Sequence, residues 1–232
     1  MRNNQEGSWR ILSKGAEATL YVGEFFGMLA VKKVRHPKKY RDPNLDLKLR
    51  RMRTRREARL LVVSKRAGVL VPFVYDVDIE NCSIVMEYVS GELLRDYIVR
   101  GTSEYQRILN IFRDLGKILA KLHESGIIHG DFTTSNIIVS EDHELFVIDF
   151  GLGYTTSSRD PEDFAVELRV FSRGLEVFHA KNYGEYFSAF LDGYRIYPNA
   201  DRVIERFREI FMRGRYVAER RIRKKFLPQN ET

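Results

Sequence analysis

The sequence predicts an α+β protein of two unequal parts, and three observations support this prediction. The first ninety residues read as short strands separated by glycine-containing turns, with one long helix among them. Beyond residue 90 the spacing of apolar side chains becomes helical. The 232 residues suffice for one substantial core, or for two small lobes that share one. We therefore expect a strand-rich N-terminal lobe over residues 1–90 and a helical C-terminal lobe over residues 91–232, with the border at Gly91.

The N-terminal lobe is expected to hold several strands and one helix. Residue alternation and turn signals place the strands at residues 9–12, 20–23, 28–34, 74–78 and 83–88. Apolar side chains at helical spacing, beginning with Leu45 and Leu49, predict a helix over residues 45–67. Pro72 ends that region before the next strand.

The C-terminal lobe is expected to be mainly helical. A helix over residues 105–124 carries apolar side chains at helical spacing, and Gly126 marks its end. Two short, very apolar strands are predicted at residues 137–139 and 145–148. Everything after Pro161 is expected to form helices.

Composition restricts the class of protein without selecting a function. The formal net charge of +7 favours polyanionic partners such as nucleic acid, nucleotides or an acidic protein surface. The single cysteine, Cys82, excludes an internal disulfide and indicates a reducing compartment. The first nine residues show no signal-like apolar region, and no apolar stretch reaches the roughly 18 residues that cross a bilayer. We expect a cytoplasmic protein without membrane association.

Two motifs carry the chemistry. Residues 129–136 read His-Gly-Asp-Phe-Thr-Thr-Ser-Asn, and Asp-Phe-Gly follows at residues 149–151. Protein kinases have this order and the same spacing between the catalytic aspartate and the asparagine. Asp131 would orient the attacking oxygen and accept its proton, while Asn136 and Asp149 would hold magnesium against the phosphates. Each acid alone could merely cap a turn; the two motifs together, in this order, favour a catalytic site.

An ATP site also needs a cation for the phosphates and an acid that holds it. Lys32 and Lys33 lie on the third predicted strand, and the local sequence favours Lys32, because Ala30 then lies two residues before it on the same strand face. Glu57, midway along the predicted helix, stands in a run of Arg and Lys. It could form a surface ion pair, but with the two motifs present we interpret it as the partner of the lysine.

The remaining ATP contacts are expected in one turn and one strand. The turn that would cover the phosphates lies between the first two strands and consists of Lys14, Gly15, Ala16, Glu17 and Ala18. Its single glycine would suit any hairpin, and its acid is expected to contact something other than ATP. The segment that would meet adenine contains Met86 at the back of the site and the backbone groups of Glu87 and Val89.

These residues resemble one family, the small atypical kinase subunit of the KEOPS complex, also called PRPK. The resemblance covers nearly the whole chain and rests on the motifs above together with three further patterns. These are Lys33-x-Arg35-x-Pro37-Lys38-x-Tyr40-Arg41, Arg53-Thr54-x-x-Glu57-Ala58-Arg59 and Glu162-Asp163-x-Ala165-Val166-Glu167-Leu168. The first pattern sets the alignment and makes Lys33 the phosphate-facing lysine. Glu167 departs from the aspartate that is usual in the family, at a position that braces the catalytic loop.

The resemblance implies a reduced two-lobed protein-kinase-like fold that lacks the long activation segment. About ten residues separate Gly151 from Pro161, and no Ala-Pro-Glu follows. It also implies a magnesium-dependent ATPase with weak Ser/Thr kinase activity, in a complex that installs threonylcarbamoyladenosine on transfer RNA. The implied partners are an ATPase-like tRNA threonylcarbamoyl-transferase subunit and other KEOPS subunits.

The C-terminal tail is a candidate contact for one of these partners. Seven basic residues and one acid lie between Arg213 and Lys225. The tail could be a solvated helix end, a contact to transfer RNA, or a docking segment that reaches the partner subunit.

Two other functions remain open from the sequence. His-Gly-Asp also resembles the aminoglycoside and choline kinases, although these small-molecule phosphotransferases need a larger helical part than the eighty or so residues after Gly151. A non-catalytic RNA- or protein-binding module of kinase shape is the other, and the intact set of catalytic residues argues against it.

Overall fold

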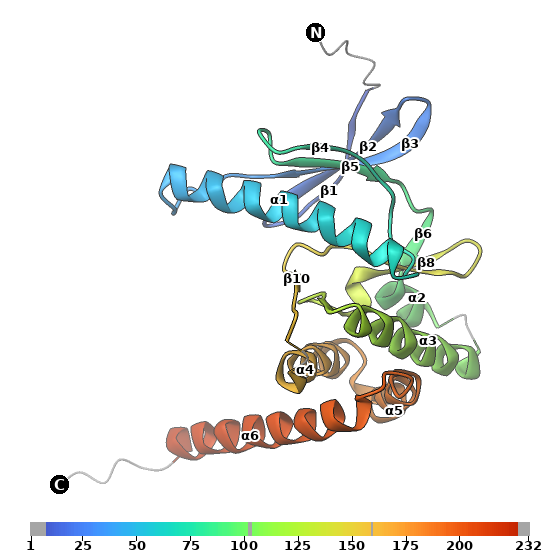
Figure 1. The fold of residues 1–232 in the computed structure, drawn as a ribbon. Helices are drawn as coiled ribbons and strands as arrows, with labels where there is room; N and C mark the ends of the chain where they lie inside the picture. The colour runs from blue at the N-terminus through green and yellow to red at the C-terminus, as the bar shows by residue number, and fades with distance from the viewer. Residues whose placement is uncertain (1–7, 102–103, 159, 227–232) are drawn as a thin grey trace, which may run out of the picture.

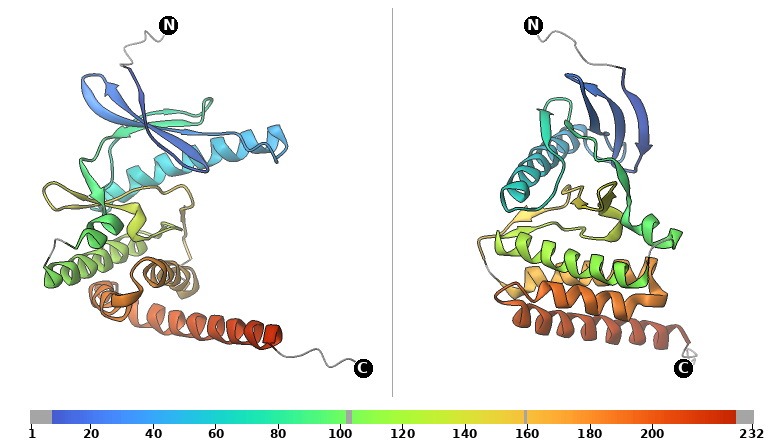
Figure 2. Two further views of the ribbon diagram at one scale, coloured as in Figure 1. Left: turned by 180° about the vertical axis from the view of Figure 1, so that it is seen from behind. Right: turned by 90° about the vertical axis from the view of Figure 1, so that its right-hand side faces the viewer.

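The computed structural model describes residues 8–101, 104–158 and 160–226, with side chains as far as Arg213. An antiparallel sheet and helix α1 form one part of the molecule, and a group of helices forms the other (Figure 1). The views in Figure 2 show α1 between the sheet and the helical part. The predicted α+β architecture is confirmed, while the border at Gly91 stays a prediction; β6 starts at that residue.

The sheet of the first part has five strands in the order β1-β2-β3-β5-β4. Their bounds are Arg10–Lys14 for β1, Ala18–Phe25 for β2, Met28–Arg35 for β3, Val74–Asp78 for β4 and Ser83–Glu87 for β5. Phe26 and Gly27 connect β2 to β3 with φ angles of 50° and 79°, the left-handed backbone of a tight hairpin. All five predicted strands are present: β4 has the predicted bounds, and the other four differ from prediction by one or two residues at one or both ends.

Helix α1 spans Pro43–Arg66. The Asp42 carboxylate accepts hydrogen bonds from the backbone N–H groups of Asn44 and Leu45, and proline occupies the first helical position. The helix therefore begins two residues before its predicted start. Its inward face buries Glu57, Leu60 and Leu61.

The second part contains five helices, two 3-10 turns and short strands among the residues that the structure describes. The helices are α2 (Leu94–Arg100), α3 (Tyr105–Glu124), α4 (Pro161–Phe178), α5 (Tyr183–Tyr194) and α6 (Ala200–Phe226), and the 3-10 turns are η1 (Thr134–Asn136) and η2 (Ala180–Asn182). The strands are β6 (Gly91–Leu93), β7 (Ile127–Ile128), β8 (Ile137–Ser140), β9 (Leu145–Val147) and β10 (Tyr154–Thr155). Strands β6, β8 and β9 form one small sheet, and β7 pairs with β10.

Helices α3 and α5 approach each other closely, and two glycines make this possible. A Cβ atom at Gly116 would lie 2.0 Å from the Phe190 carbonyl oxygen, and one at Gly193 would lie 1.8 Å from that of Arg113. Buried aromatic side chains such as Phe112 and Phe171 fill the space around this contact. The packed helices support β7, β8 and the loop between them. Within the described residues, no helix is both long and apolar enough to cross a membrane.

Candidate active site

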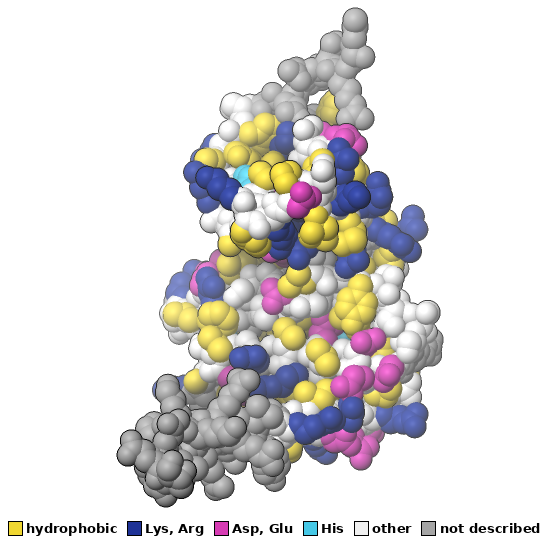
Figure 3. Space-filling model, turned by 90° about the vertical axis from the view of Figure 1, so that its left-hand side faces the viewer, with side chains coloured by type: hydrophobic (Ala, Val, Ile, Leu, Met, Phe, Trp, Pro, Cys, Tyr) yellow, Lys and Arg dark blue, Asp and Glu magenta, His cyan; other side chains and the backbone are white. Residues whose placement is uncertain are grey.

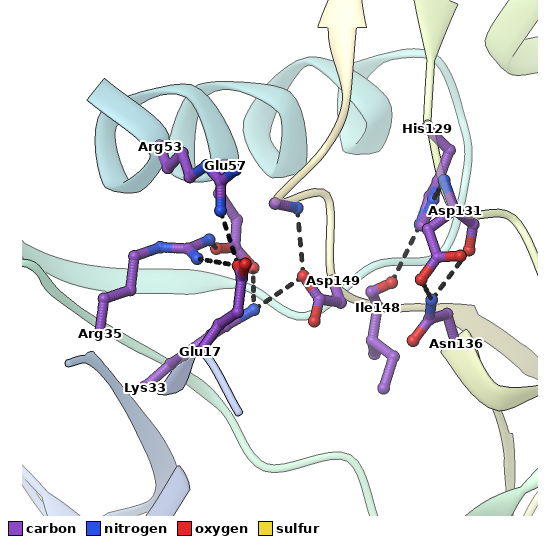
Figure 4. A network of polar contacts seen from close by, with 11 residues as sticks. Glu17, Lys33, Arg35, Arg53, Glu57, His129, Asp131, Asn136, Ile148 and Asp149 are labelled. Carbon is purple, nitrogen blue, oxygen red and sulfur yellow. Dashed lines mark hydrogen bonds and ion pairs between the residues drawn. The ribbon is translucent and has the colours of Figure 1, made fainter. Parts of the chain in front are cut away.

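Lys33 lies at the centre of a chain of ion pairs beneath the sheet (Figure 4). Its Nζ atom is 2.7 Å from Glu57 Oε1 and 2.8 Å from Asp149 Oδ1. Lys33 and Glu57 are buried, whereas about half of the Asp149 side chain is exposed. Strand β3, helix α1 and the segment after β9 each contribute one of the three side chains. The structure thus brings together three residues whose first and last members, Lys33 and Asp149, are more than a hundred positions apart in sequence.

The charges of this group stabilise one another. Burial alone would lower the pKa of Lys33, but the Glu57 and Asp149 carboxylates outweigh it and raise that pKa. Burial would raise the pKa of Asp149, but the nearby Lys33 ammonium outweighs it, with help from the Gly151 N–H, and lowers that pKa. Lysine and aspartate are therefore both charged at neutral pH.

Lys32, the alternative favoured by the local sequence, points elsewhere. Its Nζ atom lies over the Trp9 ring, 5.6 Å from the centroid. Neighbouring residues of a strand point to opposite faces, so Lys32 and Lys33 cannot both reach Glu57. The geometry supports Lys33 as the phosphate-facing lysine.

Two arginines with no role predicted from the sequence extend the network towards the phosphate-covering turn. Arg35 is buried, and its guanidinium donates to Glu57 Oε2 while lying 3.8 Å from Glu17 Oε2. Arg53 of α1 donates to Glu17 Oε2 at 2.7 Å. Glu17 therefore contacts protein cations instead of pointing freely towards a nucleotide. The only signal for this in the sequence was an acid where phosphates are expected.

The catalytic-loop residues lie on the other side of Asp149 (Figure 4). Asn136 Nδ2 donates to the Asp131 backbone oxygen and to Asp131 Oδ2, both at 2.8 Å. His129 Nε2 donates to the Ile148 carbonyl oxygen at 3.0 Å, and its Nδ1 accepts from the Asp131 N–H at 3.2 Å. The imidazole thus links the Asp131 loop to the segment that carries Asp149.

Glu167 of α4 braces this loop from below. Its Oε1 accepts from the Gly130 N–H at 2.6 Å, and its Oε2 accepts from the His129 N–H at 3.2 Å. His123 Nε2 donates to the same Oε2 at 2.9 Å, and Tyr194 holds the other side of the His123 ring. Both carboxylate oxygens accept from buried donors, so the longer side chain of Glu167 does the bracing expected of aspartate.

The segment expected to contact adenine lies at the end of β5 and just after it, and the segment expected to cover the phosphates lies where β1 meets β2. Met86 is buried on β5 opposite Val31 of β3, and Val89 is half-buried between β5 and β6. The Glu87 carboxylate accepts from the Phe73 N–H at 3.0 Å. Lys14 ends β1, Gly15, Ala16 and Glu17 form the turn, and Ala18 begins β2. Their contacts with a nucleotide stay predictions.

The side-chain oxygens of Asp149 and Asn136 suit a magnesium ion that is also bound by phosphates. Magnesium prefers oxygen ligands and is commonly bound through one or two carboxylates together with substrate phosphates and waters. Asp149 and Asn136 offer one carboxylate and one amide oxygen. Among the described residues, no group of three or more His, Cys, Asp and Glu could hold a metal alone. The ion would therefore depend on the nucleotide for its remaining ligands.

Comparison with known proteins identifies the family. The protein kinase domain family matches residues 25–184. The KEOPS complex subunit Bud32 of Pyrococcus abyssi is 39% identical over 216 residues, which cover 89% of this chain and 96% of that protein. The chain belongs to the Bud32 family. The predicted resemblance and the reduced protein-kinase-like fold are confirmed.

Other Bud32-like sequences occur within longer proteins. A probable bifunctional tRNA threonylcarbamoyladenosine biosynthesis protein of Methanothermobacter thermautotrophicus is 45% identical over 206 residues, 89% of this chain and 36% of that protein. The Methanocaldococcus jannaschii protein of the same description is 38% identical over 208 residues, 89% of this chain and 37% of its own length. The chain spans about a third of these relatives.

A solved structure supports the fold alone. Rio2 kinase from Chaetomium thermophilum, crystallised as an ADP/Mg²⁺-phosphoaspartate complex, has a TM-score of 0.60. The match covers 91% of this chain and 71% of that one, at 18% sequence identity.

Proposed function

We propose that this chain is a magnesium-dependent ATPase and atypical Ser/Thr protein kinase of the cytoplasm. It works as the Bud32-type subunit of a KEOPS complex that makes threonylcarbamoyladenosine in transfer RNA. The observation that carries the proposal is the position of Lys33, which joins Glu57 to Asp149 beside the Asp131–Asn136 pair. Family membership supports the choice of complex.

The residues divide the work of phosphoryl transfer. Lys33, oriented by Glu57, would neutralise the phosphates, and Asn136 and Asp149 would hold magnesium, which neutralises charge on the phosphate oxygens. Asp131 would orient the attacking oxygen and accept its proton. Asn136 fixes one Asp131 carboxylate oxygen at 2.8 Å, so the carboxylate is already oriented before substrate arrives.

The short segment after Asp149 favours ATP hydrolysis over efficient phosphorylation of arbitrary proteins. In protein kinases a long activation segment provides the platform for a peptide substrate. Here helix α4 begins at Pro161, and β10 is already paired with β7 between Gly151 and that point. Little chain remains to bind an extended peptide.

The test is phosphate release from magnesium-ATP by the parent chain and by Asp131→Asn. It is measured alone, with the transferase-type partner subunit, and with that subunit plus transfer RNA. Asp142→Asn, an exposed acid in the β8–β9 turn, is the matched control. We expect Asp131→Asn to lose about 10²–10⁴-fold in rate under every condition, as for other general bases. Equal rates for the two variants would overturn the catalytic assignment, and an ATPase indifferent to partner and RNA would overturn the assignment to the complex.

A further inference from the structure

Helix α1 carries far more positive charge than the active site uses. Its 24 residues include nine Lys and Arg and only two acids, Asp46 and Glu57. Both acids are buried, and both are already paired: Asp46 with Arg50 at 2.7 Å, and Glu57 with Lys33 and Arg35. The two acidic side chains of α1 therefore point inward, and neither neutralises the positive charge of the outward face.

The outward face is a single basic row. Lys48, Arg55, Arg59 and Arg66 are all exposed, at spacings of seven, four and seven residues that keep them on one side of the helix. At about 1.5 Å per residue, the row is roughly 27 Å long. Within the described part of the chain, none of the four forms an ion pair. We call these four residues the basic face of α1.

The surroundings of this face are also basic. The segment before α1 includes Lys39 and Tyr40, both exposed, and the Arg41 guanidinium lies over the Tyr40 ring, 5.3 Å from its centroid. In Figure 3, which looks towards the start of α1, Lys and Arg crowd the part of the molecule that holds the sheet and this helix, with few acids between them. Mutual repulsion of these cations is unfavourable unless a polyanion binds.

We propose that the basic face of α1 binds the phosphate backbone of RNA. An apolar protein interface fits this face less well than a polyanion, because its four cations form one row and the exposed large apolar side chains of α1 are only Leu45, Met52 and Val62. A membrane surface would also fit poorly, because the apolar face of α1 is buried against the sheet. Arginine matches phosphate through two parallel hydrogen bonds, and an exposed tyrosine suits stacking on an unpaired base.

The choice of transfer RNA as the partner rests on the proposed function, while the face itself follows from the layout of charge on α1. The N-terminal end of α1 and the C-terminal end of α6 lie on the same side of the molecule (Figures 1 and 2). A large RNA lying along α1 could therefore also extend towards the C-terminal end of α6.

The experiment compares two triple variants of the full chain with the same change in charge. The first, Arg55→Glu/Arg59→Glu/Arg66→Glu, reverses the charge of three of the four residues of the basic face. The matched control, Arg107→Glu/Lys117→Glu/Lys121→Glu, reverses three exposed residues of α3. Binding of a transfer RNA transcript is followed by fluorescence anisotropy over a range of salt concentrations, and polyglutamate serves as a probe for acidic protein.

We expect the α1 variant to bind transfer RNA more weakly and to flatten the slope of log affinity against log salt by about three units, roughly one per lost phosphate contact. The α3 control should keep the parent slope. Equal slopes for parent and α1 variant, or equal losses in both variants, would overturn the proposal. So would loss of polyglutamate binding with transfer RNA binding intact, which would assign the face to an acidic protein.

Magnesium-ATP binding measured on the same samples separates this proposal from the preceding one. None of the three substituted α1 arginines contacts the Lys33–Glu57–Asp149 group, so the α1 variant should bind nucleotide like the parent. A parent chain that binds RNA through α1 but releases no phosphate would overturn the ATPase proposal and leave the RNA-binding face in place.

Discussion

Lys33 forms two ion pairs at once, so it decides the protonation of the acid that would hold magnesium. Asp149 sits in a place where burial favours the neutral acid, and the lysine charge reverses that preference and lowers its pKa. The backbone at Asp149 is itself unusual, with φ at 61°, in the left-handed region that non-glycine residues rarely adopt. A substitution at this position can therefore remove the charge while keeping a residue that tolerates the left-handed backbone.

We predict that Asp149→Asn abolishes the magnesium-dependent part of ATP binding and leaves the fold intact. Asparagine tolerates the left-handed backbone better than most residues, so the variant removes the charge without adding strain. Calorimetric titration of ATP with and without magnesium measures the effect, and Asp142→Asn is the control. Undiminished magnesium-ATP affinity in Asp149→Asn would show that Asp149 does not hold the ion.

Replacing Lys33 should make nucleotide binding depend on pH. In Lys33→Met the strongest contribution that lowers the pKa of Asp149 is lost, and only the Gly151 N–H and Arg35 still oppose burial, so that pKa rises above its value in the parent. The carboxylate then becomes protonated at a higher pH than in the parent as pH falls, and magnesium-ATP affinity should be lost at that higher pH. ATP titrations at several pH values measure the shift. Lys32→Met should behave like the parent, and a greater sensitivity of Lys32→Met would move the phosphate-facing lysine by one residue.

Elements were predictable where local sequence determines them and missed where distant partners do. Helix α3 and strand β3 carry strong periodic patterns, and both are present. Strand β7 has two residues, and it exists only because β10 pairs with it from far along the chain. Beyond residue 91 the expectation of helical sequence with two strands therefore omitted β6, β7 and β10, as well as the short helix α2.

The candidate site shows the same division. Asp131, Asn136 and Asp149 could be selected because their spacing within two short motifs is fixed by the chemistry. Arg35 could not, because an arginine on a strand gives no sign that it will be buried against Glu57. Arg53 could not be selected either, because it is one of nine Lys and Arg residues on α1. His123 read only as part of a helix, yet it holds Glu167 beneath the catalytic loop.

The hydrogen bonds from Glu167 of α4 to the catalytic loop should contribute both to the stability of the fold and to the rate of ATP hydrolysis. In Glu167→Gln, one carboxylate oxygen becomes an NH₂ group facing a buried donor, which typically costs about 1–3 kcal/mol. We expect a lower free energy of unfolding in urea and slower ATP hydrolysis, with Glu167→Asp closer to the parent. Glu124→Gln, at an exposed position, should change stability by no more than about 0.5 kcal/mol. A Glu167→Gln variant as stable and active as the parent would show that the bracing hydrogen bonds are dispensable.

At the scale of the whole molecule, the helical part is small and its far end is highly charged. Helices α5 and α6 pack beneath α3 and α4 (Figure 1) and add no layer beside the catalytic residues. This arrangement favours a nucleotide site open to other macromolecules over an enclosed site for a small-molecule acceptor. The predicted basic tail begins at Arg213 on α6, and its side chains from residue 214 onward lie outside those described.

Truncation after Met212 should separate the two roles predicted for the tail. If the tail contacts phosphates, the truncated chain should bind transfer RNA more weakly and lose about one unit of salt slope per basic contact removed. Binding of magnesium-ATP should not change. Retained RNA binding with lost stimulation by the partner subunit would instead identify a docking segment. Parent-like behaviour in both assays would leave the tail as a solvated helix end.

The pairing of β10 with β7 has a consequence for how such an enzyme is turned on. Many kinases are switched by phosphorylation of a mobile segment at this position, which becomes ordered when its new charge meets arginine. In this chain the backbone is already fixed there: Tyr154 pairs with Ile128, and the Thr156 N–H donates to the Gly126 carbonyl oxygen at 2.8 Å. A phosphate added at Tyr154, Thr155 or Thr156 would therefore meet a backbone that is already paired. We therefore expect phosphorylation of these residues to change ATP hydrolysis little, and regulation to come instead from binding of the proposed partner subunit.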